Sequence, residues 1–370
     1  MKILILANSD VGLYRFRKEL LQKLLEEEHH VFIALPGGEK VIRMVQMGCA
    51  FIRTEIDRRG INPANDIALL KKYVHIIRTT DPDIVLTYTI KPNIYGGIAC
   101  RILKKRYIAN ITGLGSALEK SGIIKWIAVF LYRLALKEAS CIFFQNAANQ
   151  KKMHAFGIKG KREVRIPGSG VNTDEHPFEA YPDKSESVEF LFIGRIMKEK
   201  GIEELMNAAE YVKISCPDIR FTVAGECEED YQGRLEEAQQ KGILTYLGFR
   251  DDVHTLIKGC SAVVLPSYHE GMSNVLLEAS SGGRPVLASR IPGCAEVFED
   301  GATGIGFEAK NVESLKKAFL TFISLPYEKK KEMGLRARKR MEDRFDRAAV
   351  IQAYMEEIRR AGKEGKDELI

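Results

Sequence analysis

The feature that most restricts the fold of this chain is an alternation of short apolar runs with amphipathic stretches, which starts twice. In the first half, strand-like runs stand at residues 2–7, 30–35, 49–56, 83–88, 107–112, 140–145 and 164–167, and helix-like periodicity covers 14–28, 63–80, 93–104 and 123–139. A polar, turn-rich segment at residues 167–185 interrupts the pattern. Strands that alternate with helices form β-α-β units around a parallel sheet.

The pattern restarts at residue 189. It predicts strands at 189–194, 219–225, 243–248, 262–267 and 285–289, and helices at 201–214, 229–241, 273–281, 312–325 and 327–358. We therefore expect an α/β protein with two Rossmann-like domains, whose parallel sheets face an interdomain cleft where ligands bind at the carboxyl ends of the strands. The predicted domains are 1–169 and 170–345, followed by a C-terminal helix at 346–370 that crosses back to the first domain.

The composition excludes several other classes of protein. The chain is 45% hydrophobic and 29% charged, which is ordinary for a folded domain and unlike collagen or low-complexity disorder. Its seven cysteines include no C-x-x-C pair, which indicates reduced thiols and no structural zinc site. The first apolar run is too short for a signal peptide, and Lys125 and Arg133 interrupt the longest apolar stretch. We therefore expect a cytoplasmic protein without a membrane-spanning helix.

The charge is divided unevenly between the two halves. Residues 1–168 hold 28 basic and 14 acidic residues, a net charge of +14, whereas the remainder has a net charge of −8. A basic first half suits anionic lipid headgroups, phosphates or nucleic acid, and the alternative is an ordinary solvated surface. The helix at 123–139 could lie in a bilayer interface, because it carries Trp126, Phe130 and Tyr132 among cations, or it could be an ordinary core helix.

The most informative motif follows the apolar run at 262–267 and leads into a helix. It reads Ser267-Tyr268-His269-Glu270-Gly271-Met272-Ser273-Asn274-Val275-Leu276-Leu277-Glu278. Ser273 or Asn274 can cap the helix, whose first N–H groups would face an anion, and Gly271 lets a ligand approach the backbone. Glu270 and Glu278 are about 12 Å apart along a helix, which fits the two ends of a sugar nucleotide. The alternative is that both glutamates are surface acids.

Further candidate residues follow other predicted strands. Gly194 and Arg195 begin a glycine-hinged loop that ends with Lys200, and both cations can reach a diphosphate. Gly12 follows the first strand and allows a turn over phosphate or sugar, with Arg15 and Arg17 adding charge. Lys91 and Thr112, in Tyr88-Thr89-Ile90-Lys91-Pro92-Asn93 and Asn110-Ile111-Thr112-Gly113-Leu114-Gly115-Ser116, would line the other wall of the cleft, unless these are ordinary turns.

Metal binding has little support in the sequence. Asp81-Pro82-Asp83 matches the D-x-D of metal-dependent sugar transferases, but it stands before a strand and is interpreted as a turn. The seven histidines form no H-x-x-x-H pair. We expect neither a metal nor a cofactor.

Taken together, these motifs resemble those of family 4 glycosyltransferases of the GT-B fold. The resemblance rests on Gly194-Arg195…Lys200-Gly201, Gly225-Glu226, Leu247-Gly248-Phe249, Glu270-Gly271…Glu278-Ala279, Gly282-Gly283-Arg284-Pro285-Val286 and Ile291-Pro292-Gly293. The first half resembles bacterial enzymes that extend undecaprenyl-diphosphate-linked sugars, through Asn8 to Tyr14 and Asn110 to Gly115.

The resemblance implies a retaining, metal-independent hexosyl- or N-acetylhexosaminyltransferase that uses a nucleotide sugar, UDP-linked by expectation. Arg195, Lys200 and Glu270 would be catalytic, the two cations holding the diphosphate and Glu270 the donor sugar. Gly12, Gly194, Phe249, Arg250, Gly271, Met272, Ser273, Asn274, Val275 and Glu278 would bind the donor, with Glu278 on the ribose and 247–250 beside the base. Lys91 and Thr112 would serve the acceptor, a glycan carried by a polyprenyl diphosphate at the inner face of the cell membrane.

Two positions depart from the family pattern. Only Gly12 stands where the family often has two adjacent glycines, and Asn110-Ile111-Thr112 replaces a histidine that many members carry, so Thr112 is the expected substitute. Two other functions remain open: a sugar-nucleotide epimerase on a similar scaffold, and a non-catalytic module that binds a sugar or nucleotide. No nucleic-acid partner is expected.

Overall fold

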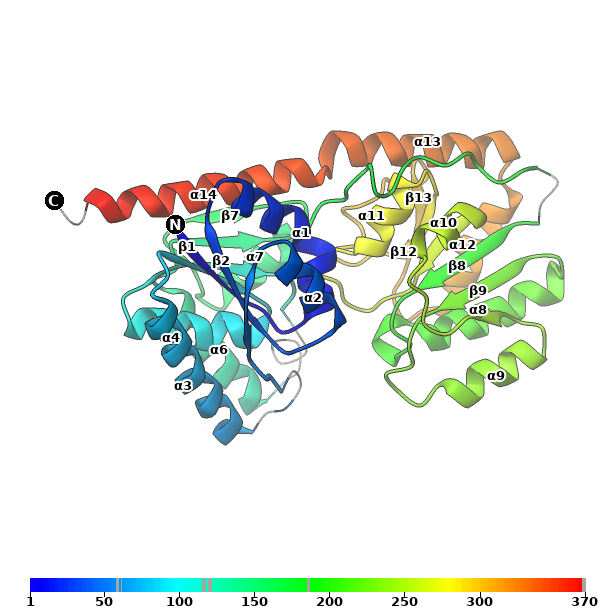
Figure 1. Cartoon of the computed structure of the whole chain (residues 1–370). Coiled ribbons are helices and arrows are strands. Elements are labelled where there is room, and N and C mark those ends of the chain that lie inside the picture. The colour runs from blue at the N-terminus through cyan, green and yellow to red at the C-terminus, as the bar shows by residue number, and fades with distance from the viewer. Residues whose placement is uncertain (58–59, 61, 115–117, 119–121, 185–186, 368–370) are drawn as a thin grey trace. The chain divides into compact units, whose positions relative to one another are not determined.

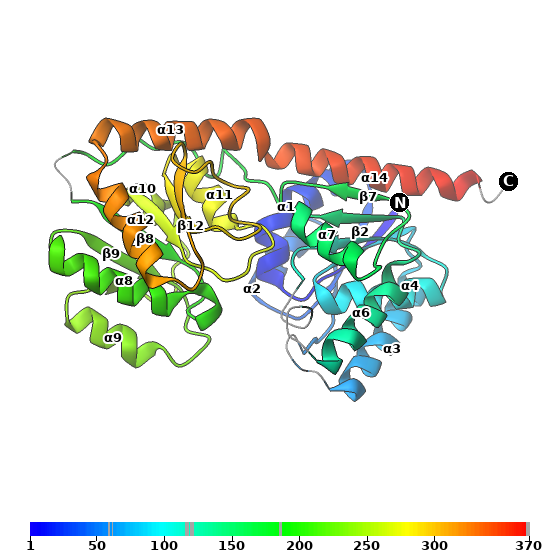
Figure 2. The ribbon, with the colours of Figure 1, turned by 180° about the vertical axis from the view of Figure 1, so that it is seen from behind.

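The computed structural model describes residues 1–57, 60, 62–114, 118, 122–184 and 187–367. The chain divides into two compact units, one of Met1–Ser169 with Ala348–Ile370 and the other of Gly170–Arg347 (Figures 1 and 2). Each unit is built around a parallel sheet, as the sequence predicts. The interdomain cleft stays a prediction.

The first unit contains a seven-stranded parallel sheet. Its strand order is β3-β2-β1-β4-β5-β6-β7. The strands are β1 (Lys2–Leu6), β2 (His30–Leu35), β3 (Ala50–Arg53), β4 (Ile84–Tyr88), β5 (Arg106–Ile111), β6 (Cys141–Phe144) and β7 (Glu163–Arg165). Leu4 pairs with Phe32 on one side and with Val85 on the other. The central strands read as continuous apolar runs because helices cover both faces of the sheet.

Two helical layers enclose this sheet. Alternate residues of β1 point to opposite faces, with Ile3 and Ile5 in one core cluster and Leu4 and Leu6 in the other. The first cluster includes side chains of α1 (Asp10–Glu26), α2 (Glu39–Gln46) and α14 (Arg347–Asp367). The second includes side chains of α3 (Pro63–Thr80), η1 (Pro92–Gly96), α4 (Gly97–Ile102), α6 (Ile123–Leu136) and α7 (Ala147–Ala155). The C-terminal helix α14 thus completes the core of the first unit.

The second unit has a six-stranded parallel sheet in the order β10-β9-β8-β11-β12-β13. The strands are β8 (Glu189–Ile193), β9 (Arg220–Ala224), β10 (Thr245–Tyr246), β11 (Ala262–Leu265), β12 (Val286–Ser289) and β13 (Gly304–Phe307). The helices are α8 (Ile202–Ser215), α9 (Gln232–Gln240), α10 (Val253–Gly259), α11 (Asn274–Ser281), α12 (Val312–Ser324) and α13 (Tyr327–Arg344). Helix α8 packs beside α12, and α11 packs beside α10 and α13 (Figure 1).

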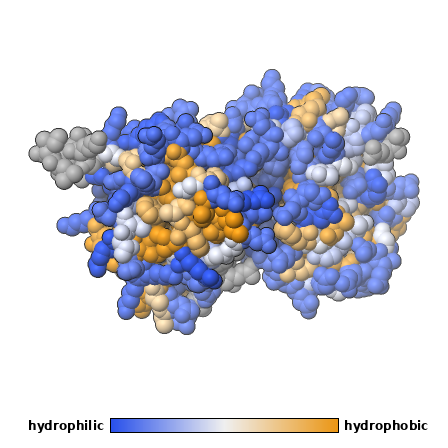
Figure 3. Space-filling view, in the orientation of Figure 1, coloured by the Kyte–Doolittle hydropathy of each residue, from blue (hydrophilic) through white to orange (hydrophobic). Residues whose placement is uncertain are grey.

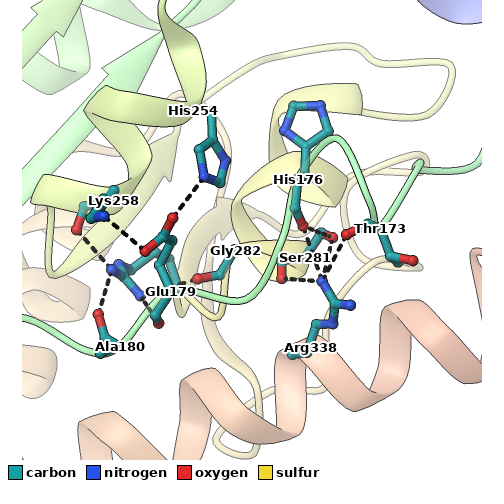
Figure 4. Close-up of polar contacts among 10 residues, drawn as sticks. Thr173, His176, Glu179, Ala180, His254, Lys258, Ser281, Gly282 and Arg338 are labelled. Carbon is teal, nitrogen blue, oxygen red and sulfur yellow. Dashed lines mark hydrogen bonds and ion pairs between the residues drawn. The ribbon is translucent and has the colours of Figure 1, made fainter.

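The segment interpreted as a linker is fastened to the second unit. Arg338 donates hydrogen bonds to the carbonyl oxygens of Thr173, His176 and Ser281. Glu179 pairs with His254 and with Lys258, each at 3.1 Å (Figure 4). Turn-rich sequence at this point therefore does not mean a loose connection.

Arg284 also holds this segment, a role that the sequence did not reveal. Its guanidinium is completely buried and donates to the carbonyl oxygens of Glu179, Ala180 and Lys258. Burial of a guanidinium is costly unless its donors find acceptors. The carbonyl groups satisfy Nη1 and Nη2 of Arg284, whereas its Nε has no hydrogen-bond partner.

The structure divides the helical stretch predicted at 327–358 into α13 and α14, close to residue 346, where the sequence analysis begins the C-terminal helix. The backbone of Val171 inserts at the break: its N–H donates to Phe345 O at 2.8 Å, and its carbonyl accepts from Arg347 N at 3.1 Å. Neither glycine nor proline marks this break in the sequence. Helices α2, α7 and α10 and strand β13 were also not predicted.

Hydrophobic residues reach the surface of the first unit on the face that Figure 3 presents, among hydrophilic ones. On α2, for example, Ile42 and Val45 are exposed.

The close approach of Gly170 to the α13–α14 break gives a prediction about stability. Gly170 has φ +64°, and a Cβ there would stand 2.6 Å from Arg347 Cα. We expect Gly170→Ala to lower the free energy of unfolding by about 2 kcal/mol or more, from backbone strain and this clash. Urea denaturation followed by circular dichroism measures the change.

Gly233→Ala provides the matched control, because a Cβ at Gly233 in α9 meets nothing within 4 Å. It should leave stability unchanged or slightly higher, since alanine favours helix. Equal effects of the two substitutions would contradict the role given to Gly170.

Candidate active site

The candidate active site of the second unit lies where the strand order reverses. From β8 the chain proceeds outward to β9 and β10, then returns to place β11 on the other side of β8. The loops that follow β8 and β11 therefore leave the same edge of the sheet as neighbours. In open parallel sheets, ligands bind at the carboxyl ends of the strands beside such a reversal.

Glycine allows these two loops to approach closely. The loop after β8 runs from Gly194 through the short 3-10 turn η2 (Lys198–Lys200) to Gly201, which has φ +73°. A Cβ on Gly201 would lie 2.1 Å from the carbonyl oxygen of Pro266 in the loop after β11. Tyr268 N–H also donates to Glu199 O at 2.9 Å. Backbone contact thus fixes Lys200 beside the motif that contains Glu270.

Lys200 and Glu270 form an ion pair between the two loops. Lys200 Nζ lies 2.5 Å from Glu270 Oε1, and Ser267 Oγ donates to the same oxygen at 2.9 Å. The side chains retain only 18% and 13% of their exposure, so neither is a solvated surface charge. The pair therefore combines a cation and a hydrogen-bond acceptor at the sheet edge.

A neutral thiol accompanies this pair. Burial raises the pKa of Cys294 well above its ordinary value, and the negative charge of Glu270 raises it further. Cys294 therefore remains protonated, and the charges between the two loops are those of Lys200 and Glu270.

Arg195 points to a different partner. Its Nη1 donates to both carboxylate oxygens of Glu228, at 3.1 and 2.9 Å. Glu228 follows β9, and Ile196 pairs with Cys227 in a parallel bridge that ties the loops after β8 and β9 together. Half of the Arg195 side chain remains exposed. Sequence reasoning missed Glu228, although an acidic run after a predicted strand was a usable signal.

The start of α11 has the cap that the sequence suggested. Ser273 is the N-cap residue, and its side chain accepts from Leu276 N–H. Ser273 N–H donates to Gly293 O at 2.9 Å, and a Cβ on Gly293 would stand 2.5 Å from Gly271 O. Glycines after β11 and β12 therefore hold the segment Gly271, Met272, Ser273, Asn274 and Val275 against a neighbouring turn.

Glu278 is a buried carboxylate within α11, with 7% exposure. It is not a surface acid, contrary to the alternative interpretation of the sequence. Helix α11 begins at Asn274, so Glu270 precedes it, and the separation of about 12 Å expected for eight helical residues does not apply to the two carboxylates.

Phe249 and Arg250 lie further away along the sheet. They follow β10, an edge strand separated from β8 by β9. Phe249 is exposed, and Arg250 pairs with Asp252 at 2.5 Å.

Gly225, after β9, links the ends of β8, β9 and β10. Its N–H donates to Gly248 O after β10, and a Cβ on it would collide with Gly194 O after β8.

Lys91 and Thr112 lie in the first unit, so they do not share a unit with Arg195, Lys200 and Glu270. Thr112 directly follows β5 and is half-buried. Lys91 follows β4 and pairs with Asp66 at 2.7 Å. Gly115 and Ser116 fall outside the described residues.

Two expectations near the first strand are corrected. Gly12 is not in a turn, because α1 begins at Asp10 and Ser9 Oγ accepts from Gly12 N–H at 3.2 Å. Arg17 does not present its charge to a ligand, because its guanidinium is buried between the rings of Tyr88 and Tyr354.

Lys91 and Asp66 line a cavity of about 420 Å³. Other lining residues are the polar Glu55, Asp57, Asn65 and Lys72 and the apolar Ile56, Ala68 and Leu69. Such a mixture of hydrogen-bonding groups and apolar surface could hold a sugar or another polar molecule.

Across the described residues, no three or more His, Cys, Asp or Glu side chains are grouped to hold a metal ion. Within the same part of the chain, no helix is long and apolar enough to cross a membrane.

Comparison with known proteins places each unit in a glycosyltransferase family. Residues 2–146 match the family described as glycosyl transferase 4-like, and residues 174–340 match glycosyl transferases group 1. The N,N'-diacetylbacillosaminyl-diphospho-undecaprenol alpha-1,3-N-acetylgalactosaminyltransferase of Campylobacter jejuni is 26% identical, over 96% of this chain and 97% of its own length. The UDP-Gal:alpha-D-GlcNAc-diphosphoundecaprenol alpha-1,3-galactosyltransferase of Escherichia coli is 24% identical, over 71% of this chain and 72% of its own length.

A similar fold is found in the Anabaena protein Alr3699/HepE, solved in complex with UDP-glucose. It is 21% identical to this chain, with a TM-score of 0.78, and the match covers 97% of this chain and 99% of that one. The two family matches and the shared fold show that the chain belongs to the glycosyltransferases of the GT-B fold.

Proposed function

We propose that this chain transfers a sugar, with retention of configuration, from a UDP-linked hexose or N-acetylhexosamine to a glycan carried on a polyprenyl diphosphate. The reaction would serve surface polysaccharide or glycoprotein glycan assembly. The observation that carries the proposal is the Lys200–Glu270 pair at the strand reversal, with Arg195 in the same loop as Lys200. Lys200 and Arg195 offer cations for a diphosphate, and Glu270 offers a carboxylate for sugar hydroxyls.

The donor would lie along the carboxyl edge of the second sheet. Lys200 and Arg195 bind the diphosphate, and Glu270 with the N–H groups of 271–275 contacts the sugar. Glu278, a buried carboxylate of α11, accepts from the ribose hydroxyls. Phe249 and Arg250, after β10, flank the base.

In the reaction, the bond between the anomeric carbon and the diphosphate oxygen breaks while the acceptor oxygen bonds to that carbon on the same face. The O–H bond of the acceptor hydroxyl breaks, and its proton passes to the departing diphosphate. Negative charge grows on the departing diphosphate. Fixed cations stabilise such charge most when they are already in position and little exposed to water. Lys200 meets that condition through its backbone-fixed loop, and each charge-assisted hydrogen bond contributes about 1.5–3 kcal/mol.

The two bacterial relatives support the acceptor and the linkage. Both names describe alpha-1,3 transfer to a sugar on an undecaprenyl diphosphate, with a hexose from UDP-Gal in one and an N-acetylhexosamine in the other. On the acceptor side we propose Lys91, with its cavity, and Thr112. A contribution of Gly12 to donor binding stays a prediction. A lipid-linked acceptor and a first half of net charge +14 suit an enzyme at the inner membrane surface.

The two other functions have less support. Neither bacterial relative is an epimerase, and nothing else in the comparisons favours epimerisation. A non-catalytic binding module would not need Lys200, Glu270 and Ser267 joined in one little-exposed cluster.

Substitution of the cluster tests the proposed roles. We expect Lys200→Met to lower kcat about 100-fold or more, because it removes a cation that stabilises the leaving group. Arg195→Ala and Glu270→Ala should likewise abolish transfer while circular dichroism shows retained folding. Turnover is measured with UDP-sugars and a polyprenyl-diphosphate-linked sugar, by mass spectrometry of the product.

Lys198→Met is the matched control. Lys198 lies in the same 3-10 turn as Lys200, but its side chain is 64% exposed. Its Nζ is 3.9 Å from Oε2 of Glu203, which is long for an ion pair. It should retain near-normal turnover. Near-normal turnover of the Lys200 variant would show that the site is assigned incorrectly.

Metal independence and retention give a second prediction. Because Lys200 and Arg195 supply the positive charge, EDTA should leave the transfer rate unchanged. Nuclear magnetic resonance of the product should show an alpha linkage, as in the alpha-linked donor. Loss of activity in EDTA that Mn²⁺ or Mg²⁺ restores would overturn the first expectation, and a beta-linked product the second.

A further inference from the structure

Helix α6 exposes an apolar face. The residues Ile123, Trp126, Ile127, Phe130 and Leu134 are all exposed, and we call them the α6 patch. Trp126 is 63% and Phe130 64% exposed, and Trp126 is the only tryptophan of the chain. Spacings of three and four residues place all five side chains on one side of the helix.

The opposite face of α6 is buried in the usual way. Ala128, Val129, Tyr132 and Ala135 belong to the core cluster beneath the first sheet. Helix α6 is therefore a folded part of the unit, and it lies beside α4 in both ribbon views (Figures 1 and 2). A helix at a protein surface normally turns polar residues outward, whereas α6 turns large apolar ones outward. A contiguous exposed apolar surface of this kind marks a place where a partner is bound.

The charges around the α6 patch are positive. Within α6 the charged residues are Arg133 and Lys125, and no acidic residue is present. Lys125 lies on the side of the helix away from the α6 patch, with its ammonium over the Phe156 ring, so Arg133 is the cation of α6 nearer the patch. Lys137, just after the helix, is exposed, and Arg101 of α4 reaches the carbonyl oxygen of Leu134. Glu138, the nearest acid after the helix, pairs with Lys161 at 3.0 Å. An anionic partner with an apolar interior fits this surface.

We propose that the α6 patch inserts into the headgroup region of an anionic lipid bilayer, with α6 parallel to the membrane. Amphipathic helices with aromatic and aliphatic side chains on one face and cations at its border bind membranes in this way. A second copy of the chain fits less well, because it would bring the same cations face to face. The inference rests on the proposed function, since a lipid-linked acceptor requires the enzyme to work at a bilayer.

Trp126 reports on the proposal in the unmodified chain. We expect its fluorescence to shift to shorter wavelength with vesicles of phosphatidylglycerol and phosphatidylcholine, and brominated acyl chains to quench it. Vesicles of phosphatidylcholine alone should have a much smaller effect, because the cations then have no partner. An unchanged Trp126 emission with the anionic vesicles would overturn the proposal.

The double variant Ile127→Ser/Phe130→Ser keeps Trp126 and removes two patch side chains. We expect it to bind the anionic vesicles at least about tenfold more weakly in co-sedimentation. The matched control is Ile42→Ser/Val45→Ser on α2, which removes two exposed apolar side chains from the same unit and should bind unchanged. Equal binding by both double variants would contradict the proposal, as would a wild-type dimer in sedimentation velocity that the α6 variant dissociates.

Turnover of a water-soluble, short-chain acceptor separates this inference from the proposed function. The α6 variant should transfer sugar to it at the wild-type rate while losing activity on an acceptor embedded in vesicles. Absence of transfer by the wild-type chain would count against the proposed function alone. Equal rates of variant and wild type on the embedded acceptor would count against the α6 patch alone. If the double variant does not fold, the Trp126 emission of the unmodified chain decides.

Discussion

The structure of the candidate site depends on the close contact between the loops after β8 and β11. Only a glycine can occupy position 201, because the carbonyl oxygen of Pro266 fills the space of a side chain. That contact places Lys200 against Glu270. A cation fixed in this way needs little reorganisation when charge develops on a leaving group, which is the condition for electrostatic catalysis. The proposed chemistry therefore follows from a backbone packing constraint.

A second constraint concerns the connection between the units. The chain leaves the first unit at Ser169 and returns at Ala348, and within the second unit Gly170 and Val171 pack against Phe345 and Arg347. Arg284 and Arg338 then hold the following segment through its carbonyl groups. The polar connection is thus part of the second unit, and α14 is part of the core of the first.

Much of the fold was predictable because local signals agree with it. The helix at 63–80 has Asn62 as its cap and proline in its first turn, and its predicted bounds are those observed. The strand at 30–35 is likewise observed as predicted. The polar strand ends that carry Lys200, Glu270 and Ser273 were predictable for the same reason. The pairing of Arg195 with Glu228 was not, because it depends on which strands are neighbours in the sheet.

The sequence by itself determined the class of fold and the residue types at the strand ends, since alternating periodicity and glycine-containing turns act locally. Tertiary structure decided three further points. It set the break between α13 and α14, through a backbone insertion from Val171. It buried Arg284 and Arg17, whose charges otherwise suggest a surface position. It also selected the face of α6 that is covered, because a helix that is apolar on nearly all sides does not specify which side packs against a sheet.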